Sequence, residues 1–493
     1  MGRLRTGASL AAALCLISGC TQTGADQGSK STPSSRTLAG RPLVACTIKG
    51  ESPVKAQAQA LCGALPVRED RSGTGGRTVE LRVAVVPAVA AGRDAVPLFL
   101  LAGGPGEAAT QFFAWLPSVF KEVHARRDIV LVDQRGTGDS NRLTLPEMPD
   151  PTGLSTRAAD ARLSRWSRDA LGSIDADPRF YTTAAAADDL DDVREALGYR
   201  QVDLYGTSYG GTVAQYYLRQ HEGRVRAVVL DGSSPVDVPV LELLGHSSQA
   251  ALDLLFRRCA DDAACHRAFP HLATEWQSLL ARLATPLTIT DPASHETAVI
   301  DRVKLADAVH SALLTEASAA RVPLALHLAA RGQWVPAAQL IGTPPSGGPT
   351  LVMADEILCS EAWARFTPAG VNRLSAGSYA LPRELAAAGR REAMCRRLPT
   401  GLVPADDAAA VHTTLPVLWL VADGDPQDPP ANLVEVPAQQ PNSRVVVVPT
   451  QQHVVGQLGC LPSLVAAFLD AGSAKDLDVS CARTARPLPF RLS

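Results

Sequence analysis

The sequence predicts an α/β protein with a mostly parallel sheet, helices on both faces of that sheet, and a large helical insertion. Short apolar runs such as Val96 to Leu101 and Asp128 to Val132 each end in glycine or polar residues. Helical segments separate such runs, and strands that alternate with helices form parallel sheets covered on both faces. From about Pro235 to Asp406, helical periodicity replaces this alternation.

The elements can be placed in chain order. Before the insertion we expect strands at Thr78 to Val86, Val96 to Leu101, Asp128 to Val132, Gln201 to Tyr205 and Val225 to Leu230, and helices at Ala184 to Leu197 and Gly211 to His221. Within it we expect helices at Leu241 to Arg258, Leu272 to Leu283, Val303 to Leu314 and Ala319 to Ala330. After it, strands are expected at Leu415 to Ala422 and Arg444 to Val448, and a last helix at Leu461 to Leu469.

The N-terminus predicts export. Arg3 and Arg5 precede an apolar run, Ala8 to Ile17, that is too short to span a bilayer. The small residues before Cys20 resemble a bacterial lipobox, in which cleavage leaves a lipidated cysteine; an ordinary secretory signal is the alternative. We therefore expect a protein anchored to the bacterial cell envelope, on its periplasmic or outer face, whose only membrane contact is this lipid.

The domain organisation follows from these patterns. We expect a signal peptide at residues 1–19, a flexible tether rich in Ser, Thr, Gly and Gln at 20–41, the first part of the core at 42–234, a helical cap at 235–406 and the rest of the core at 407–493. A net charge of −3 argues against a nucleic-acid partner.

Ten cysteines in an exported chain predict disulfides. Cys15 leaves with the signal peptide and Cys20 takes the lipid, so eight remain. Eight cysteines allow about 105 connectivities, and the pairing of sequence neighbours is the hypothesis: Cys46 with Cys62, Cys259 with Cys265, Cys359 with Cys395 and Cys460 with Cys481. Metal binding is the rival interpretation, but no CxxC or His-x-x-x-His spacing supports it, and we expect no metal and no cofactor.

The segment from Gly206 to Gly211 predicts a serine nucleophile. It reads Gly-Thr-Ser-Tyr-Gly-Gly and follows an apolar strand, which is the G-x-S-x-G pattern of a sharp turn between a strand and a helix. Small residues are needed beside Ser208 because the turn strains its backbone. One N–H group of an oxyanion hole would come from Tyr209, and a second from the loop Gly103 to Gly106.

A serine nucleophile also needs a base and an orienting acid, and in this architecture they follow it in the chain. His453 comes just past the last buried strand, which is the position expected of the base. Asp423, Asp425 and Asp428 all follow the preceding strand, and spacing alone does not separate them; loop capping is the ordinary role of such aspartates.

Three motifs together resemble the α/β-hydrolase peptidases of the prolyl aminopeptidase and tripeptidyl aminopeptidase family. They are Gly-Gly-Pro-Gly after one strand, Asp-Gln-Arg-Gly-Thr-Gly after the next, and Gly-Thr-Ser-Tyr-Gly-Gly after the third. The resemblance covers about residues 75–235 and 410–483 and implies an α/β-hydrolase fold. It implies that Asp425, in an Asp-Pro-x-x-Pro turn, is the acid and that Gly104 donates to the oxyanion. This chain departs from the family at Asp428, where threonine is usual, and at Gln452 and Val454 beside the histidine.

The same resemblance implies a function. The family's cap has a Cys-x-Glu element that binds the substrate's free amino group, and Cys359-Ser360-Glu361 resembles it. Glu361, aided by Glu356, would then bind the ammonium; a solvated surface glutamate is the alternative. The sequence thus predicts a secreted serine aminopeptidase that acts on small peptides. An esterase or lactonase on the same triad, or a non-catalytic binding protein, are the other interpretations.

Overall fold

The computed structural model describes residues 36–493 apart from short gaps. The gaps are at 51–55, 74, 91–95, 115–118, 144–153, several positions between 156 and 173, 291–294, 296, 341–350, 363–364 and 397. The predicted signal peptide, Cys20 and most of the predicted tether lie outside the described residues. None of the helices in the described part combines the length and apolar character needed to cross a membrane.

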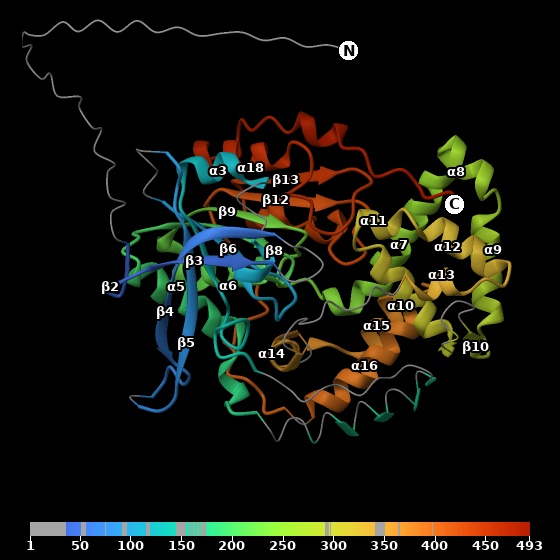
Figure 1. Cartoon of the computed structure of the whole chain (residues 1–493), viewed down its shortest axis with the longest axis horizontal. Coiled ribbons are helices and arrows are strands. Elements are labelled where there is room, and N and C mark those ends of the chain that lie inside the picture. Colours follow the sequence, from blue (N-terminus) through green and yellow to red (C-terminus); the bar gives the residue numbers. More distant parts are fainter. Residues whose placement is uncertain are drawn as a thin grey trace, which may run out of the picture. The chain divides into compact units, whose positions relative to one another are not determined.

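A nine-stranded sheet runs through the centre of the fold (Figure 1), in the order β13-β12-β9-β8-β6-β7-β5-β4-β3. Neighbouring strands from β13 to β7 pair in parallel, and β5, β4 and β3 continue the sheet in antiparallel pairs. The strands span Val44–Lys49 (β3), Gln57–Arg68 (β4), Thr78–Val86 (β5), Leu98–Leu101 (β6), Ile129–Val132 (β7), Val202–Thr207 (β8), Val225–Asp231 (β9), Val417–Ala422 (β12) and Ser443–Val448 (β13). The mostly parallel sheet is therefore confirmed.

Helices cover both faces of this sheet, which is why its central strands are apolar throughout rather than alternating. On one face, α5 (Thr183–Ala196) and α6 (Tyr209–His221) share an apolar cluster with Phe99 of β6. On the other, α3 (Lys121–Arg126) and α18 (Leu461–Ala471) share a cluster with Leu100. The parallel arrangement brings the carboxyl ends of β6, β8, β9 and β12 to one edge, where the candidate site residues follow them.

The chain between β9 and β12 is mostly helical and has its own core, which includes Leu252, Trp276, Leu305 and Leu326. It contains α7 (Val240–Asp261), α8 (Ala263–Ala268), α9 (Leu272–Arg282), α10 (Arg302–Ala312), α11 (Glu316–Ala319), α12 (Val322–Ala330), α13 (Val335–Ala338), α14 (Leu351–Ile357), α15 (Pro368–Leu374), α16 (Leu381–Cys395) and the hairpin β10 (Leu287–Thr290) with β11 (Thr297–Ile300).

Two expectations differ from the structure. The helix predicted at Ala319 to Ala330 is divided, because Pro323 lies in the first turn of α12 and lacks the N–H that a continuous helix needs there. The predicted tether is folded from Arg36 onward: β1 (Thr37–Leu38) pairs with β2 (Arg41–Pro42), and Leu38 is buried in the main core. Arg36 also forms an ion pair with Asp128. Such long-range contacts are invisible in a composition rich in Ser, Thr and Gly.

Candidate active site

Ser208 stands at the tip of the turn between β8 and α6 in a backbone conformation that is strained for a non-glycine residue, with φ 51° and ψ −124°. The glycines on either side are required by close backbone contacts. A Cβ on Gly206 would lie 2.4 Å from the carbonyl oxygen of Gly210, and one on Gly210 would lie 2.1 Å from that of Leu101. The sequence pattern therefore reflects a steric need at this turn.

The end of β9 and the residues just after it hold the strained serine on both sides. The Ser208 N–H donates to the carbonyl oxygen of Asp231 at 2.9 Å. The hydroxyl of Ser233 donates to the carbonyl oxygen of Ser208 at 2.6 Å. Surrounding contacts of this kind are what allow an unfavourable backbone conformation to persist.

His453 and Asp425 meet across two neighbouring strand ends. Nδ1 of His453 lies 2.7 Å from Oδ2 of Asp425 and 3.9 Å from Oδ2 of Asp428. The remaining oxygen of Asp425 accepts the N–H groups of Gln427 at 2.8 Å and Asp428 at 3.0 Å. Asp423 instead accepts the Thr450 N–H at 2.5 Å. Of the three aspartates that the sequence left open, Asp425 is therefore the one whose carboxylate lies within hydrogen-bonding distance of the imidazole.

The charges in this cluster alter its titration. Burial alone would lower the pKa of the His453 imidazole, but the Asp425 carboxylate, helped by Asp428, outweighs it and raises that pKa to about 9. Burial, with the negative charge of Asp425, raises the pKa of Asp428, which is also hydrogen-bonded by the Ser234 hydroxyl at 2.6 Å. The ring's other nitrogen, Nε2, lies 3.4 Å from the side-chain amide of Gln427, a residue of the cavity wall described below.

Asp231 holds the loop that carries His453, and nothing in the local sequence indicated this. We call residues 449–456 the base loop. The buried Asp231 carboxylate accepts the N–H groups of Val455 and Gly456, each at 2.8 Å, and the Tyr205 hydroxyl at 2.6 Å. Since its backbone also holds Ser208, this one residue joins the two predicted catalytic loops.

The glycine loop lies against the nucleophile. A Cβ on Gly103 would come within 3.1 Å of the Ser208 Cβ, and Gly104 has φ +107°, which a side chain would strain. Gly104 and Tyr209, the predicted oxyanion donors, both line the cavity that contains Ser208.

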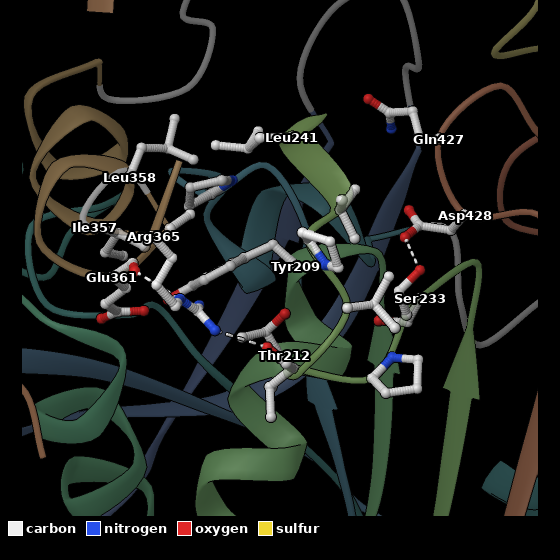
Figure 2. Close-up of a pocket in the computed structure, with 18 of the residues that line it drawn as sticks. Tyr209, Thr212, Ser233, Leu241, Ile357, Leu358, Glu361, Arg365, Gln427 and Asp428 are labelled. Carbon is white, nitrogen blue, oxygen red and sulfur yellow. Dashed lines mark hydrogen bonds between the residues drawn. The ribbon is translucent and has the colours of Figure 1, made fainter. Parts of the chain in front are cut away.

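This cavity has a volume of about 380 Å³ and lies between the sheet edge and the helical segment. Its walls are largely apolar and come from residues 235–244, at the start of that segment, and from Ile357 and Leu358. Figure 2 shows Glu361 and Arg365 at one side and Gln427 and Asp428 at the other. A concave apolar pocket with a few polar groups is typical of a small-molecule site.

Glu361 is a buried cavity residue rather than a solvated one. It lies in the π-helical turn Leu358–Ala362, and its two carboxylate oxygens accept the N–H and the hydroxyl of Thr183, each at 2.7 Å. The Thr183 hydroxyl also contacts the Tyr209 hydroxyl at 2.8 Å. Burial raises the pKa of Glu361 to about 7, because no cation compensates fully for the lost hydration.

Glu356 is not among the residues that line this cavity. It is fully buried behind the turn, where one of its oxygens accepts the Ser360 hydroxyl at 2.6 Å and the other has no partner among the described residues. Burial raises the pKa of Glu356 to about 7. The two predicted amine-binding glutamates are therefore placed differently.

The eight cysteines form the four pairs of sequence neighbours: Cys46–Cys62, Cys259–Cys265, Cys359–Cys395 and Cys460–Cys481. The third pair joins the turn that carries Glu361 to the end of α16. Disulfides are characteristic of proteins outside the cytosol.

The sequence model of the α/β-hydrolase fold family matches residues 96–456, well over half of the chain. The chain belongs to this family. The match includes β6 to β13 and therefore the elements that carry Ser208, Asp425 and His453.

Relatives of this α/β hydrolase include peptidases. The serine protease Hip1 of Mycobacterium tuberculosis is 29% identical over 307 residues, which cover 57% of this chain and 56% of Hip1. The proline iminopeptidase of Lactobacillus delbrueckii subsp. bulgaricus is 30% identical over 142 residues, covering 28% of this chain and 37% of that protein. The chain thus spans about half of Hip1 and about a third of the iminopeptidase. A solved structure of the proline iminopeptidase of Mycobacterium smegmatis aligns with 83% of this chain and 98% of its own, at 18% identity and a TM-score of 0.35.

A metal ion is an alternative explanation for the cluster of acidic groups around His453. Among the described residues, Asp425, Asp428 and His453 each offer one atom within 4.8 Å of the others, as a metal site would. Nδ1 of His453 is already hydrogen-bonded to Asp425, however, and the same geometry is that of a base with its orienting acid.

Proposed function

We propose that this α/β hydrolase is a serine aminopeptidase that cleaves short peptides from a free N-terminus. The observation that carries the proposal is that one cavity contains Ser208 on its strained turn, Gln427 next to Nε2 of His453, and the buried carboxylate of Glu361. The relatives named as a serine protease and proline iminopeptidases support a peptide substrate.

Each residue has a chemical role in this proposal. Nε2 of His453 takes the proton of Ser208 as its Oγ attacks the substrate carbonyl carbon, and gives it to the leaving amine. Asp425 keeps the other imidazole proton on Nδ1 and stabilises the imidazolium that forms when Nε2 takes the serine proton. The N–H groups of Gly104 and Tyr209 stabilise the oxyanion. In the second step His453 takes a proton from water as the water attacks the acyl-enzyme, and then returns it to Ser208 Oγ as the acid product leaves.

Glu361 binds the substrate's ammonium group. A cation that enters a largely apolar cavity loses hydration and needs an anion beside it. The Glu361 carboxylate is held in place by Thr183, and the nearby cation Arg365 is engaged with the carbonyl oxygens of Glu361 and Val236. Glu356 does not line the cavity, so it would aid Glu361 only through its negative charge, from the buried side of the same turn.

We also propose the setting of this activity. Residues 235–406 form a cap that restricts the site to small substrates, and residues 42–234 and 407–493 form the catalytic core. The chain is exported after cleavage of residues 1–19 and held at the cell envelope by a lipid on Cys20. Four disulfides are consistent with such a compartment.

A fluorophosphonate probe tests the chemistry. We expect it to label Ser208, and we expect Ser208→Ala to abolish labelling and lower turnover about a millionfold without unfolding the protein. Label on another serine would overturn the assignment. A pair of peptides, one with a free and one with an acetylated N-terminus, tests the specificity: equal cleavage would favour an esterase or a broader hydrolase over an aminopeptidase.

A further inference from the structure

The helical segment contacts the base loop just before His453. Arg258, near the end of α7, donates from Nη1 to the carbonyl oxygen of Thr450 at 3.5 Å. The base loop is therefore held from the helical segment at Thr450.

Arg258 is itself held by the C-terminal tail, residues 485–493 (Figure 1). Its Nη2 donates to the carbonyl oxygen of Leu488 at 3.1 Å, and its guanidinium lies 4.4 Å from the centre of the Phe490 ring. The tail continues onto the helical segment, where the Arg491 N–H donates to the carbonyl oxygen of Ala320 at 2.9 Å. The planar guanidinium presents its donors in a rigid fork while it stacks on the Phe490 ring, a combination that a lysine ammonium does not offer.

The base loop needs such support because its backbone is unfavourable. Thr450 has φ +58° and Val454 has φ +60°, values that β-branched residues rarely adopt. On the core side, Asp423 and Gly424 hold the loop at Thr450 and Gln451, and Asp231 holds it at Val455 and Gly456. Arg258 provides a further contact, to the Thr450 carbonyl, from the helical segment.

We propose that Arg258 is a positioning residue that acts through the Thr450 carbonyl to keep His453 aligned with Ser208. This inference rests on the proposed role of His453 as the base. A displacement of about 1 Å at a reacting group can cost about a hundredfold in rate, so a distant contact that fixes the loop can control turnover without touching substrate.

The kinetic test compares Arg258→Met and Arg258→Lys with a matched control, Arg282→Met. Arg282 makes the same kinds of contact elsewhere in the helical segment, since it stacks on Trp334 at 5.1 Å and donates to the carbonyl oxygen of Ala330 at 3.2 Å. The substrate is p-nitrophenyl acetate, and kcat is expressed per active site titrated by fluorophosphonate. We expect Arg258→Met to lower kcat about 10- to 100-fold with little change in KM. Arg258→Lys should recover part of the loss, and Arg282→Met should stay within about twofold of the parent. Parental kcat in Arg258→Met, or an equal loss in Arg282→Met, would overturn the proposal.

Hydrogen exchange tests the same contact without catalysis. Amides of the base loop should exchange faster in Arg258→Met than in the parent or in Arg282→Met. Unchanged protection would refute the positioning role even if activity fell. If the parent protein is not labelled by fluorophosphonate and does not hydrolyse the ester, the proposed function fails. The exchange comparison would still decide whether Arg258 holds the base loop.

Discussion

Oδ2 of Asp425 lies 2.7 Å from Nδ1 of His453, while the other oxygen of that carboxylate is fixed by two backbone N–H groups of its own turn. We therefore expect Asp425→Asn to lower kcat/KM about ten-thousandfold, because an amide favours the wrong imidazole tautomer. Asp428→Asn is the matched control, since its amide oxygen can still accept the Ser234 hydroxyl. Steady-state kinetics of both variants check this. If Asp428→Asn is the more damaging change, the acid has been assigned wrongly.

Asp231→Asn should destabilise the fold and loosen the base loop together. A single amide oxygen cannot accept from Val455, Gly456 and Tyr205 as the carboxylate does, and a buried donor without a partner costs about 1–3 kcal/mol. Urea unfolding should show that the free energy of unfolding falls by about 2 kcal/mol or more. Asp478→Asn, on an exposed loop, should change stability by less than about 0.5 kcal/mol. Similar losses in the two variants would argue against a special role for Asp231.

Glu361→Gln should raise KM for peptides with a free N-terminus and leave a small ester unaffected. Glutamine fits the site, because its oxygen can accept the Thr183 N–H while its NH2 group donates to the Thr183 hydroxyl. The lost charged hydrogen bond is worth about 1.5–3 kcal/mol, or about 10- to 100-fold in kcat/KM. Glu356→Gln, outside the cavity lining, should have the smaller effect on selectivity. An equal loss of kcat/KM on the ester would show that Glu361 stabilises the structure of the site rather than binding the substrate's amine.

The preference for free peptide over ester should depend on pH. Burial raises the pKa of Glu361 to about 7, so its negative charge is lost as the pH falls below that value. A peptide's α-amino group loses its positive charge above about pH 8. The ratio of kcat/KM for the free peptide to kcat/KM for the ester should therefore be largest between about pH 7 and 8. Protonation of His453 does not affect this ratio, because both substrates need the same base. A ratio that keeps this pH dependence in Glu361→Gln would contradict the explanation.

Reductant should destabilise the protein by about 2–4 kcal/mol for each disulfide that opens. Cys359–Cys395 has a further consequence, because it ties the turn that carries Glu361 to α16. Replacing both of these cysteines with serine should raise KM for free peptides more than replacing Cys46 and Cys62, which join the edge strand β3 to its neighbour β4. Unfolding curves and kinetics on the two double variants check this. Equal KM values in the two double variants would show that the Cys359–Cys395 disulfide does not support amine binding by Glu361.

The sequence by itself determined the features that depend on neighbours along the chain. The apolar runs between helices specify a parallel sheet because both its faces must be buried. The Gly-x-Ser-x-Gly pattern locates Ser208 because only glycine fits the crowded turn, and the strand before Pro449 locates His453. These signals are local, so they can be interpreted without coordinates.

Only the tertiary structure decided which of these groups meet. Asp423, Asp425 and Asp428 follow the same strand within six residues, and the choice between them needed the direction of each carboxylate. Asp231 and Arg258 lie far in sequence from the base loop that they hold, and Thr183 is equally distant from Glu361. Glu361 is buried, and its pKa raised to about 7, because the turn that carries it packs against Thr183 of the distant helix α5. Contacts between distant segments and desolvation depend on packing, which a single sequence does not display locally.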